Sequence, residues 1–419
     1  MKKTIISMAC IALISNACQS EDSDKTPVAN EERPVPGELT DTNSEDTSTS
    51  TDSTEGLALN EGQATIKHLV HSAVKASSSF QLQSKAFHQN VIEFCQAPSQ
   101  QSREMMQAGF KALNQRWQYL DAIKLGPLME RQQELRYQVY AWPSAVTSSC
   151  RIDLEVLKSE VSPDYQLSSK MSQKGLGALE YLVFTGKEHS CRASMTGFAT
   201  WNDRSQNSVD LARCSYLKLL SSENSSVAMN LEQRMTSYEK QFGDWSKLDI
   251  TSVQNLLQEF SNSYFFLDTV VKDRKIGLAA GLKPELCPRK GCNTLVEQSH
   301  SELSKDSITA NLQAFNDIFS GPDNGEAQKG FYHLLESKGA IALASRMVLN
   351  LENAISNLKS EGRSLFELAE ESGSDCSAGD DRSICQHYSD VKTVTDDLKG
   401  EFLEILKLKA PKSAQGDSD

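Results

Sequence analysis

The chain has 419 residues, of which 38% are hydrophobic and 24% charged, and its formal net charge is −13 at pH 7. So acidic a chain is repelled by nucleic-acid phosphates and by anionic lipid headgroups, which argues against electrostatic binding to either. The charge balance is compatible with a cationic or metal-loaded partner, but it identifies none.

The first residues have the layout of a secretory signal peptide. Two lysines near the N-terminus precede an apolar run from Ile5 to Ile14, and small residues lead up to Cys18. A small residue directly before a cysteine is what a lipoprotein signal peptidase requires. We therefore expect residues 1–17 to be removed and Cys18 to carry a lipid.

Ordinary signal-peptidase cleavage after Ala17 is the alternative, because Ser15 and Ala17 also permit it. Gln19 follows the cysteine, and it is not the aspartate that would favour retention of a lipoprotein in the inner membrane. We expect the mature protein in the cell envelope, in the periplasm or at the outer membrane, with the lipid as its membrane contact.

Composition divides the remaining chain. Residues 18–56 are mostly Asp, Glu, Ser, Thr and Pro, which cannot bury enough apolar surface to offset ordering entropy, so they are expected to form a disordered tether. Roughly 350 residues follow, more than one compact core usually covers. We expect an N-terminal helical subdomain at 57–286, a C-terminal helical subdomain at 287–411 and a disordered tail at 412–419.

Helical periodicity extends through nearly all of the folded part. Apolar residues recur at three- and four-residue steps, which places them on one stripe of a helix. Runs of alternating β-branched residues are absent, so the predicted fold class is all-α, with two helical-bundle subdomains. The clearest helical segments are 66–83, 253–271, 308–319, 341–358 and 391–408.

The cysteine count predicts disulfides. Ten cysteines are present, and eight remain after the signal peptide and the anchor, an even number for an oxidising compartment. A metal-thiolate site is less favoured, because no pair has the two-residue spacing of zinc sites. Connectivity cannot be deduced from sequence alone. Close spacing favours Cys287 with Cys292, Cys376 with Cys385 and Cys191 with Cys214, which leaves Cys95 for Cys150.

One carboxylate stands inside an apolar run, Lys174 to Phe184. Gly175 and Gly177 permit a close backbone approach, and Glu180 follows them. Burial of Glu180 is costly unless an arginine, a water network or a metal accompanies it. A functional site and an internal salt bridge that fixes helix packing both remain open, and the residues alone favour the salt bridge.

Other polar and aromatic residues are open to two interpretations. Asp268 and Lys272 lie four residues apart in an apolar context, where they can form a helix-stabilising ion pair or line a site. Trp142 is more typical of a core than of a binding wall. His68 and His71 could chelate a metal, but a solvated helix face is the favoured interpretation.

Several segments together resemble the imelysin-like proteins, a family that includes bacterial iron-regulated envelope proteins and the periplasmic component of a ferrous-iron uptake system. The resemblance covers most of the chain after the tether. It implies an all-α domain with a ligand cleft between its subdomains, near Trp142, Gly175, Gly177, Asp268 and Lys272. The segments are Tyr140–Pro143 with Arg151–Asp153, Gly175–Phe184, Asn311–Phe315 with Ile318–Gly321, and Val391–Phe402.

In many members of that family, the segment matching Gly175–Glu180 reads Gly-x-His-x-x-Glu, and the histidine and glutamate are proposed metal ligands. Here the glutamate is Glu180, but Gly177 stands at the histidine position and offers no side-chain ligand. The resemblance therefore implies Glu180 alone as a metal ligand, and no catalytic residue. The chain lacks His-Glu-x-x-His, so the peptidase activity first ascribed to the family is not expected.

The resemblance predicts a non-enzymatic envelope lipoprotein involved in acquiring iron or another divalent metal. Its partners would be a metal ion, a metal-carrying ligand or an envelope receptor protein. The alternative is a metal-free interaction component of the envelope, which the tether and the missing histidine favour. A metallopeptidase is the least favoured class, because no zinc triad is present.

Overall fold

The computed structural model describes residues 59–282, 292–321, 329–371, 376 and 380–414. The predicted signal peptide, the tether, Cys18 and Cys287 lie outside these residues. Of the predicted tail, the structure describes a single 3-10 turn, Lys412–Ala414 (η9). No helix in the described part of the chain is both long and apolar enough to cross a membrane.

The described residues form helices and connecting turns without a strand, so the predicted all-α class is confirmed. The α-helices are α1 (Leu59–Gln96), α2 (Gln100–Ile123), α3 (Glu134–Val139), α4 (Ser149–Val161), α5 (Gly175–Phe184), α6 (Gln206–Gln241), α7 (Ile250–Tyr264), α8 (Ser304–Ser320), α9 (Phe331–Ser337), α10 (Ile341–Ser360), α11 (Leu365–Glu371), α12 (Ser383–Asp397) and α13 (Leu403–Leu406).

Short 3-10 and π segments connect these helices. The predicted helix at 253–271 is interrupted, because α7 ends at Tyr264 and a π-helical segment, η6 (Leu267–Gly277), follows it. The others are η1 (Gly126–Leu128), η2 (Glu130–Gln133), η3 (Met171–Gln173), η4 (Trp201–Asp203), η5 (Trp245–Lys247), η7 (Asn293–Leu295) and η8 (Leu398–Phe402).

Side-chain caps fix where several helices begin. The Ser99 hydroxyl accepts a hydrogen bond from the backbone N–H of Ser102 at 3.1 Å, and the Ser102 hydroxyl accepts one from the Ser99 N–H, which forms a capping box before α2. Asp249 accepts from the N–H of Ser252 at 2.7 Å and begins α7 in the same manner. Both caps satisfy N–H groups that the first helical turn leaves without a partner.

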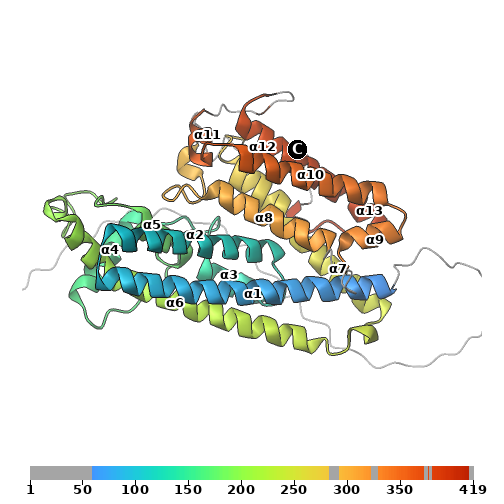
Figure 1. The fold of residues 1–419 in the computed structure, drawn as a ribbon, viewed down its shortest axis with the longest axis horizontal. Coiled ribbons are helices and arrows are strands. Elements are labelled where there is room, and N and C mark those ends of the chain that lie inside the picture. Colours follow the sequence, from blue (N-terminus) through green and yellow to red (C-terminus); the bar gives the residue numbers. More distant parts are fainter. Residues whose placement is uncertain (1–58, 283–291, 322–328, 372–375, 377–379, 415–419) are drawn as a thin grey trace, which may run out of the picture. The chain divides into compact units, whose positions relative to one another are not determined.

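The long helices α1 and α6 lie alongside each other, and α2 packs against α1 (Figure 1). On its other side α2 contacts α8, which in turn packs against α10; α12 contacts both α10 and η6. The contact between α2 and α8 therefore brings together residues from the two predicted subdomains.

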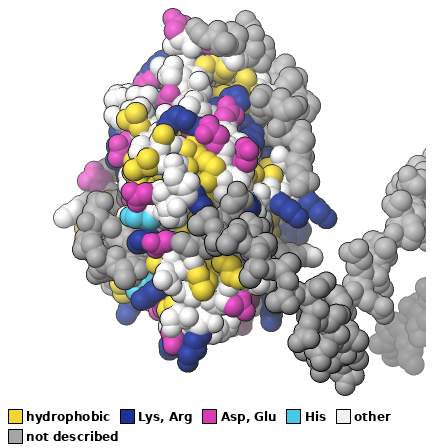
Figure 2. Space-filling model, turned by 90° about the vertical axis from the view of Figure 1, so that its right-hand side faces the viewer, with side chains coloured by type: hydrophobic (Ala, Val, Ile, Leu, Met, Phe, Trp, Pro, Cys, Tyr) yellow, Lys and Arg dark blue, Asp and Glu magenta, His cyan; other side chains and the backbone are white. Residues whose placement is uncertain are grey.

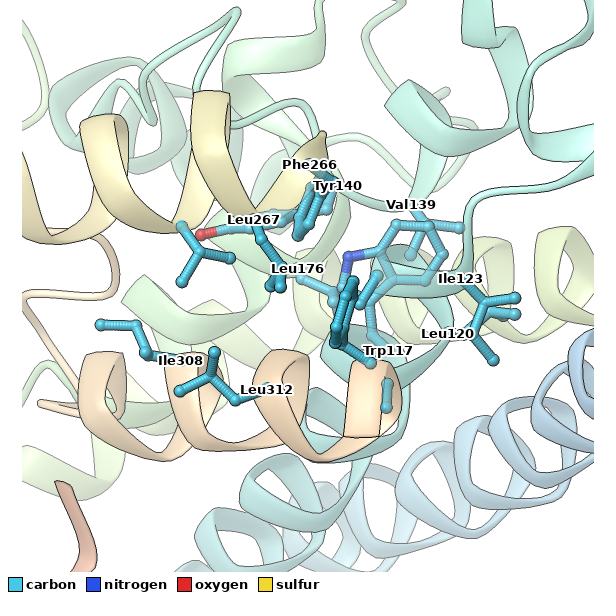
Figure 3. Packing of buried hydrophobic residues seen from close by; sticks show 14 of the residues in the cluster. Trp117, Leu120, Ile123, Val139, Tyr140, Leu176, Phe266, Leu267, Ile308 and Leu312 are labelled. Atoms are coloured by element: carbon cyan, nitrogen blue, oxygen red, sulfur yellow. The ribbon is translucent and has the colours of Figure 1, made fainter. Parts of the chain in front are cut away.

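Large apolar side chains fill this junction. Trp117 of α2 is fully buried and lies among side chains from α5, α8 and the segment preceding η6 (Figure 3). Its ring packs against Phe80 of α1, with 5.2 Å between the ring centroids. Rings of this size contribute much of the free energy of core packing. The other core residues labelled in the same view are Leu120, Ile123, Val139, Tyr140, Leu176, Phe266, Leu267, Ile308 and Leu312.

Three disulfides join described cysteines, and two of the predicted pairs are wrong. Cys376 pairs with Cys385 as predicted, but Cys95 pairs with Cys214 and Cys150 with Cys191. Cys292 is also disulfide-bonded, and its predicted partner Cys287 lies outside the described residues.

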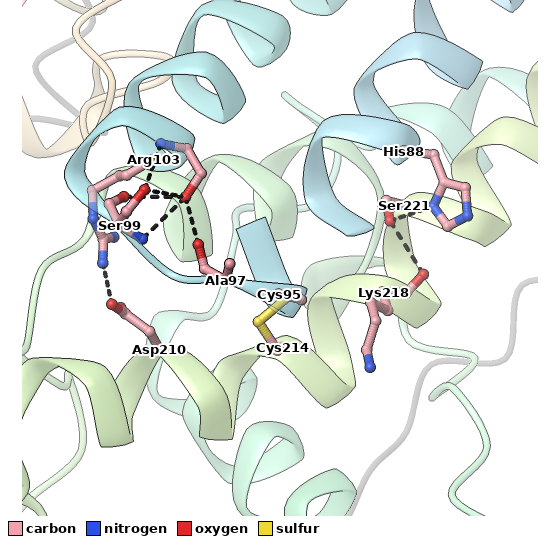
Figure 4. The surroundings of a disulfide bond; sticks show 10 residues. His88, Cys95, Ala97, Ser99, Arg103, Asp210, Cys214, Lys218 and Ser221 are labelled. Atoms are coloured by element: carbon pink, nitrogen blue, oxygen red, sulfur yellow. Dashed lines mark hydrogen bonds and ion pairs between the residues drawn. A yellow bond between two sulfur atoms is a disulfide. The ribbon is translucent and has the colours of Figure 1, made fainter. Parts of the chain in front are cut away.

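The pairing error has a structural cause. Cys95 lies in the last turn of α1, and the side-by-side packing of α1 and α6 brings Cys214 to it from 119 residues away (Figure 4). Arg103 of α2 forms an ion pair with Asp210, one turn before Cys214. Spacing along the chain predicts short loops, whereas these partners are set by which helices are neighbours.

Candidate functional site

Glu180 lies on α5, whose start is fixed by a glycine. Gly175 has φ +67°, and a Cβ at this position would lie 2.4 Å from the carbonyl oxygen of Val139. Only glycine combines this backbone conformation with so close an approach. The first turn of α5 therefore sits directly against the end of α3, and Glu180 follows with its side chain only 4% exposed.

The carboxylate of Glu180 is held by hydrogen-bond donors from a distant segment. Its Oε1 accepts the backbone N–H of His300 at 3.0 Å, the N–H of Ser301 at 2.9 Å and the Ser301 hydroxyl at 2.9 Å. The His300 ring packs edge-on against Tyr181, the next residue of α5, with centroids 5.0 Å apart. The partner of the buried carboxylate is thus neither an arginine nor a cation, but a pair of backbone amides and a hydroxyl.

Burial raises the pKa of Glu180 to about 7. The hydrogen bonds from Ser301 and His300 act in the opposite direction, since they stabilise the charged form, while the nearby carboxylate of Glu297 raises the pKa further. The Glu180 carboxyl therefore exchanges its proton close to neutral pH, unlike an ordinary surface glutamate.

A second buried carboxylate, Glu297, forms an ion pair with Lys275. The Lys275 Nζ lies 3.0 Å from Glu297 Oε2, and both residues are 1% exposed. Gln118 contacts both residues, because its Nε2 donates to Glu297 at 3.2 Å and its Oε1 accepts from Lys275 at 2.7 Å. Burial lowers the pKa of Lys275, and the charge of Glu297 opposes that shift. Sequence analysis missed this pair, since isolated polar residues give no periodic signal.

Amide and hydroxyl side chains extend the network from α2 to α8. Asn114 Nδ2 donates to the Ser307 hydroxyl at 2.9 Å and to Gln298 Oε1 at 3.2 Å, and Asn311 Nδ2 donates to the carbonyl of Gln118 at 2.6 Å. The Ser301 hydroxyl that binds Glu180 also reaches the Gln298 carbonyl. We call this network the central polar cluster; its members are Asn114, Gln118, Glu180, Lys275, Glu297, Gln298, Ser301, Ser307 and Asn311.

Trp142 borders the central polar cluster. The Lys275 Nζ lies 5.8 Å from the centroid of the Trp142 ring, and Arg136 donates to the Trp142 carbonyl at 3.3 Å. Arg136 also forms a bidentate pair with Asp121, at 2.7 and 2.9 Å. Of the predicted residues, Glu180 therefore belongs to the cluster and Trp142 adjoins it.

Gly177, where the resemblance places a histidine in other proteins, is closely covered. A Cβ at Gly177 would lie 2.2 Å from the hydroxyl oxygen of Thr147. Real Cβ atoms do not come so close to another heavy atom, so any larger side chain requires Thr147 to move. The structure thus gives a steric reason for glycine at this position.

Asp268 and Lys272 form the predicted ion pair, at 3.3 Å, and both side chains are fully buried. The pair is part of a larger group, because Lys272 also lies 3.1 Å from Asp273, and Lys399 lies 3.1 Å from Asp268. The residues belong to the π segment η6 and to η8. This ion-pair group fixes η6 against the C-terminal helices, which fits the structural interpretation of the pair.

The two histidines of the first helix do not share one environment. His71 is exposed and lies 3.2 Å from Glu239, but His68 is buried, with its Nε2 3.4 Å from the carbonyl of Asp317. The prediction of a common solvated face is therefore wrong for His68, because α8 covers that side of α1.

Within the described ranges, no group of three or more His, Cys, Asp and Glu side chains is arranged to hold a metal ion. Three donors already occupy Oε1 of Glu180, and a cation at that oxygen would have to displace them. These donors stabilise the carboxylate form of Glu180.

The described fold is an all-helical domain whose two sets of helices meet at a buried polar cluster. A family model described as imelysin matches residues 75–374, so this chain belongs to the imelysin family. The match extends across both predicted subdomains. No curated protein matches the chain.

Two solved structures share the fold. An imelysin-like protein from Psychrobacter arcticum 273-4 has a TM-score of 0.60 and 14% sequence identity, and the match covers 84% of this chain and 98% of that one. A candidate iron-regulated protein A precursor from Parabacteroides distasonis ATCC 8503 has a TM-score of 0.61 and 15% identity, with 85% and 96% covered. At these identities the similarity establishes the fold alone.

Proposed function

We propose that this imelysin-family protein is a non-enzymatic component of the bacterial cell envelope that takes part in acquiring iron or another divalent metal. The disulfides are typical of proteins that fold in an oxidising compartment. The name of the Parabacteroides relative associates that protein with iron regulation, which supports the same role here. Lipid attachment at Cys18 would hold the protein at the membrane.

The observation that carries this proposal is the pair of buried carboxylates, Glu180 and Glu297, at the junction of α2, α5 and α8. Burial, and to a smaller extent the charge of Glu297, raises the pKa of Glu180. Buried carboxylates with perturbed pKa values are found at functional sites more often than elsewhere. A metal ion at this junction would bind the deprotonated form of Glu180.

Calorimetric titration of the mature protein with ferrous, ferric, zinc and cupric ions tests the role of Glu180. We expect saturable binding of at least one ion, and its loss in Glu180→Gln, which removes the charge and keeps the shape. Glu352→Gln, an exposed change of the same kind on α10, serves as the matched control. Equal binding by the Glu180 variant and the control would remove Glu180 as a ligand.

A metal-free interaction component of the envelope is the second candidate function. The saturation of Glu180 Oε1 by three donors favours it. If no ion binds to the mature protein, this function becomes the better account, and crosslinking in intact envelopes would then identify the partner. Peptide hydrolysis with and without a chelator tests the metallopeptidase alternative, for which we expect no activity in either condition.

A further inference from the structure

A cavity of about 480 Å³ lies between α1, α2 and the end of α8. None of the residues that line it belongs to the central polar cluster, so the cavity is separate from that cluster. Small-molecule pockets in proteins commonly have volumes of about 300 to 1,000 Å³. The cavity is therefore large enough to hold a metabolite-sized ligand.

The α1 wall of the cavity presents hydrogen-bond donors. Ser72, Lys75 and Ser79 follow one another at three- and four-residue steps, so they lie on one face of the helix. Arg116 and Tyr119, three residues apart on α2, form the opposite wall. Two cations and several hydroxyls thus point toward the same space.

The acidic residue at the cavity is already satisfied. Asp317 accepts the Tyr119 hydroxyl at 2.9 Å through Oδ2, and it accepts Gln313 Nε2 at 2.8 Å through Oδ1. Burial raises the pKa of Tyr119, and the charge of Asp317 raises it further, so the phenol keeps its proton and remains a donor. Asp317 thus binds neutral donors, and its carboxylate adds one negative charge to a cavity that two cations line.

Lys75 and Arg116 have no ion pair or hydrogen bond with any other described side chain. Both residues are exposed, so their charges face the solvent as well as the open space of the cavity. In a chain with a net charge of −13, Lys75 and Arg116 bring two positive charges to one cavity. They supply the positive potential that an anionic ligand would need.

We propose that this cavity binds a small organic anion, whose carboxylate or phosphate oxygens meet Lys75 and Arg116. Arginine binds such oxygens through two parallel N–H groups, and lysine acts as a point charge beside it. The hydroxyls of Ser72 and Ser79 would complete the contacts to the anion. This site does not depend on the metal role proposed for Glu180.

Titration of the mature protein with citrate and with inorganic phosphate tests the site, and sucrose is the neutral control. We expect saturable binding of one or both anions and none of sucrose. The double variant Lys75→Gln and Arg116→Gln should bind on the order of tenfold more weakly, because each lost contact involves a charged group. Lys67→Gln with Lys85→Gln, two exposed lysines of α1 outside the cavity, should bind as tightly as the unmodified protein.

The anion that binds identifies the ligand class. Binding of citrate alone assigns the site to carboxylates, and binding of phosphate alone assigns it to phosphate-bearing ligands. The proposal is wrong if neither anion binds, or if the cavity variant binds as tightly as the control variant. Circular dichroism of both double variants separates a lost site from a lost fold.

Discussion

Glu180 illustrates what single residues reveal in a sequence and what they hide. Its burial could be predicted, because it stands within an apolar run, and the structure confirms it. Its partners could not be predicted, because the amides of His300 and Ser301 come from a turn 120 residues away. Glu297 and Lys275 were missed altogether, since a single charged residue in a mixed segment resembles a surface residue until its burial is known.

The raised pKa of Glu180 makes the stability of the protein depend on pH. The folded-state pKa of about 7 lies above the ordinary value of 4.5, so between these values the folded protein holds a proton that the unfolded chain releases. The contribution of this group is therefore fully present at low pH and is lost as pH rises toward 7. From pH 5 to pH 8, the free energy of unfolding should fall less for Glu180→Gln than for the unmodified protein. Urea denaturation at the two pH values measures this change.

Glu352→Gln should leave that pH dependence unchanged, because its carboxylate is exposed. If the unmodified protein and Glu180→Gln lose the same free energy of unfolding between pH 5 and pH 8, the carboxyl of Glu180 does not titrate there.

Lys275→Met should destabilise the protein by about 3 to 5 kcal/mol, because it leaves the Glu297 carboxylate buried without its cation. Lys111→Met is the control, since Lys111 is exposed and pairs with Asp306 at the surface. That change should alter the free energy of unfolding by no more than about 1 kcal/mol. Urea denaturation of both variants at pH 8 measures the difference, and equal effects would mean that Glu297 finds another partner.

Gly175→Ala should destabilise the protein more than Gly243→Ala does. Both glycines have positive φ, so each substitution introduces backbone strain of about 1 to 2 kcal/mol. A Cβ at Gly175 also meets the Val139 carbonyl, whereas a Cβ at Gly243 meets no atom within 4 Å. The difference between the two thermal denaturation midpoints measures the effect of the steric contact between α3 and α5. Equal midpoints for the two variants would show that α5 can shift to relieve that contact.

At the scale of the elements, periodicity predicted helices well but could not predict how they end or pair. Repeating apolar residues at 253–271 indicated one helix, yet Tyr264 ends α7 and a π segment begins at Leu267. A change in helix type moves the backbone hydrogen bonds and leaves the apolar stripe nearly intact, so the sequence carries little trace of it. The disulfide error arose for a related reason, since helix neighbours are set by tertiary packing.

Loss of the Cys95–Cys214 disulfide should destabilise the protein more than loss of Cys376–Cys385. The first pair spans 119 residues and the second spans 9, and a longer closed loop removes more entropy from the unfolded chain. Loop entropy alone predicts a difference of about 2 kcal/mol between the two Cys→Ala double variants. Chemical denaturation measures it, and an equal loss for both would indicate that native contacts outweigh loop entropy.

At the scale of the molecule, the sequence identified the family and the all-helical class but not the way in which α2 joins the two sets of helices. The described ion pairs are spread over many elements, and Figure 2 shows basic and acidic side chains interspersed with small apolar patches on the face that it draws. The functional sites proposed here therefore depend on local groups of residues, which overall charge could not reveal.

The described helices should unfold as one cooperative unit. Residues 57–286 and 287–411 were predicted as two helical subdomains of one domain, and α2 and α8 share both an apolar core and the central polar cluster. Leu312→Ala should therefore lower the free energy of unfolding by about 2 to 5 kcal/mol, and calorimetry should still show a single transition. Two resolved transitions in that variant would establish that the two sets of helices fold independently.

The order of the cysteines along the chain has a consequence for how the disulfides form as the protein folds. Along the chain they run Cys95, Cys150, Cys191 and Cys214, but the native bonds place the second and third cysteines inside the loop closed by the first and fourth. A chain that enters an oxidising compartment N-terminus first exposes Cys95 and Cys150 long before Cys214 arrives. Joining thiols in order of arrival would produce the wrong bond, so maturation must either wait for α6 to reach α1 or depend on thiol–disulfide exchange to correct the first pairing.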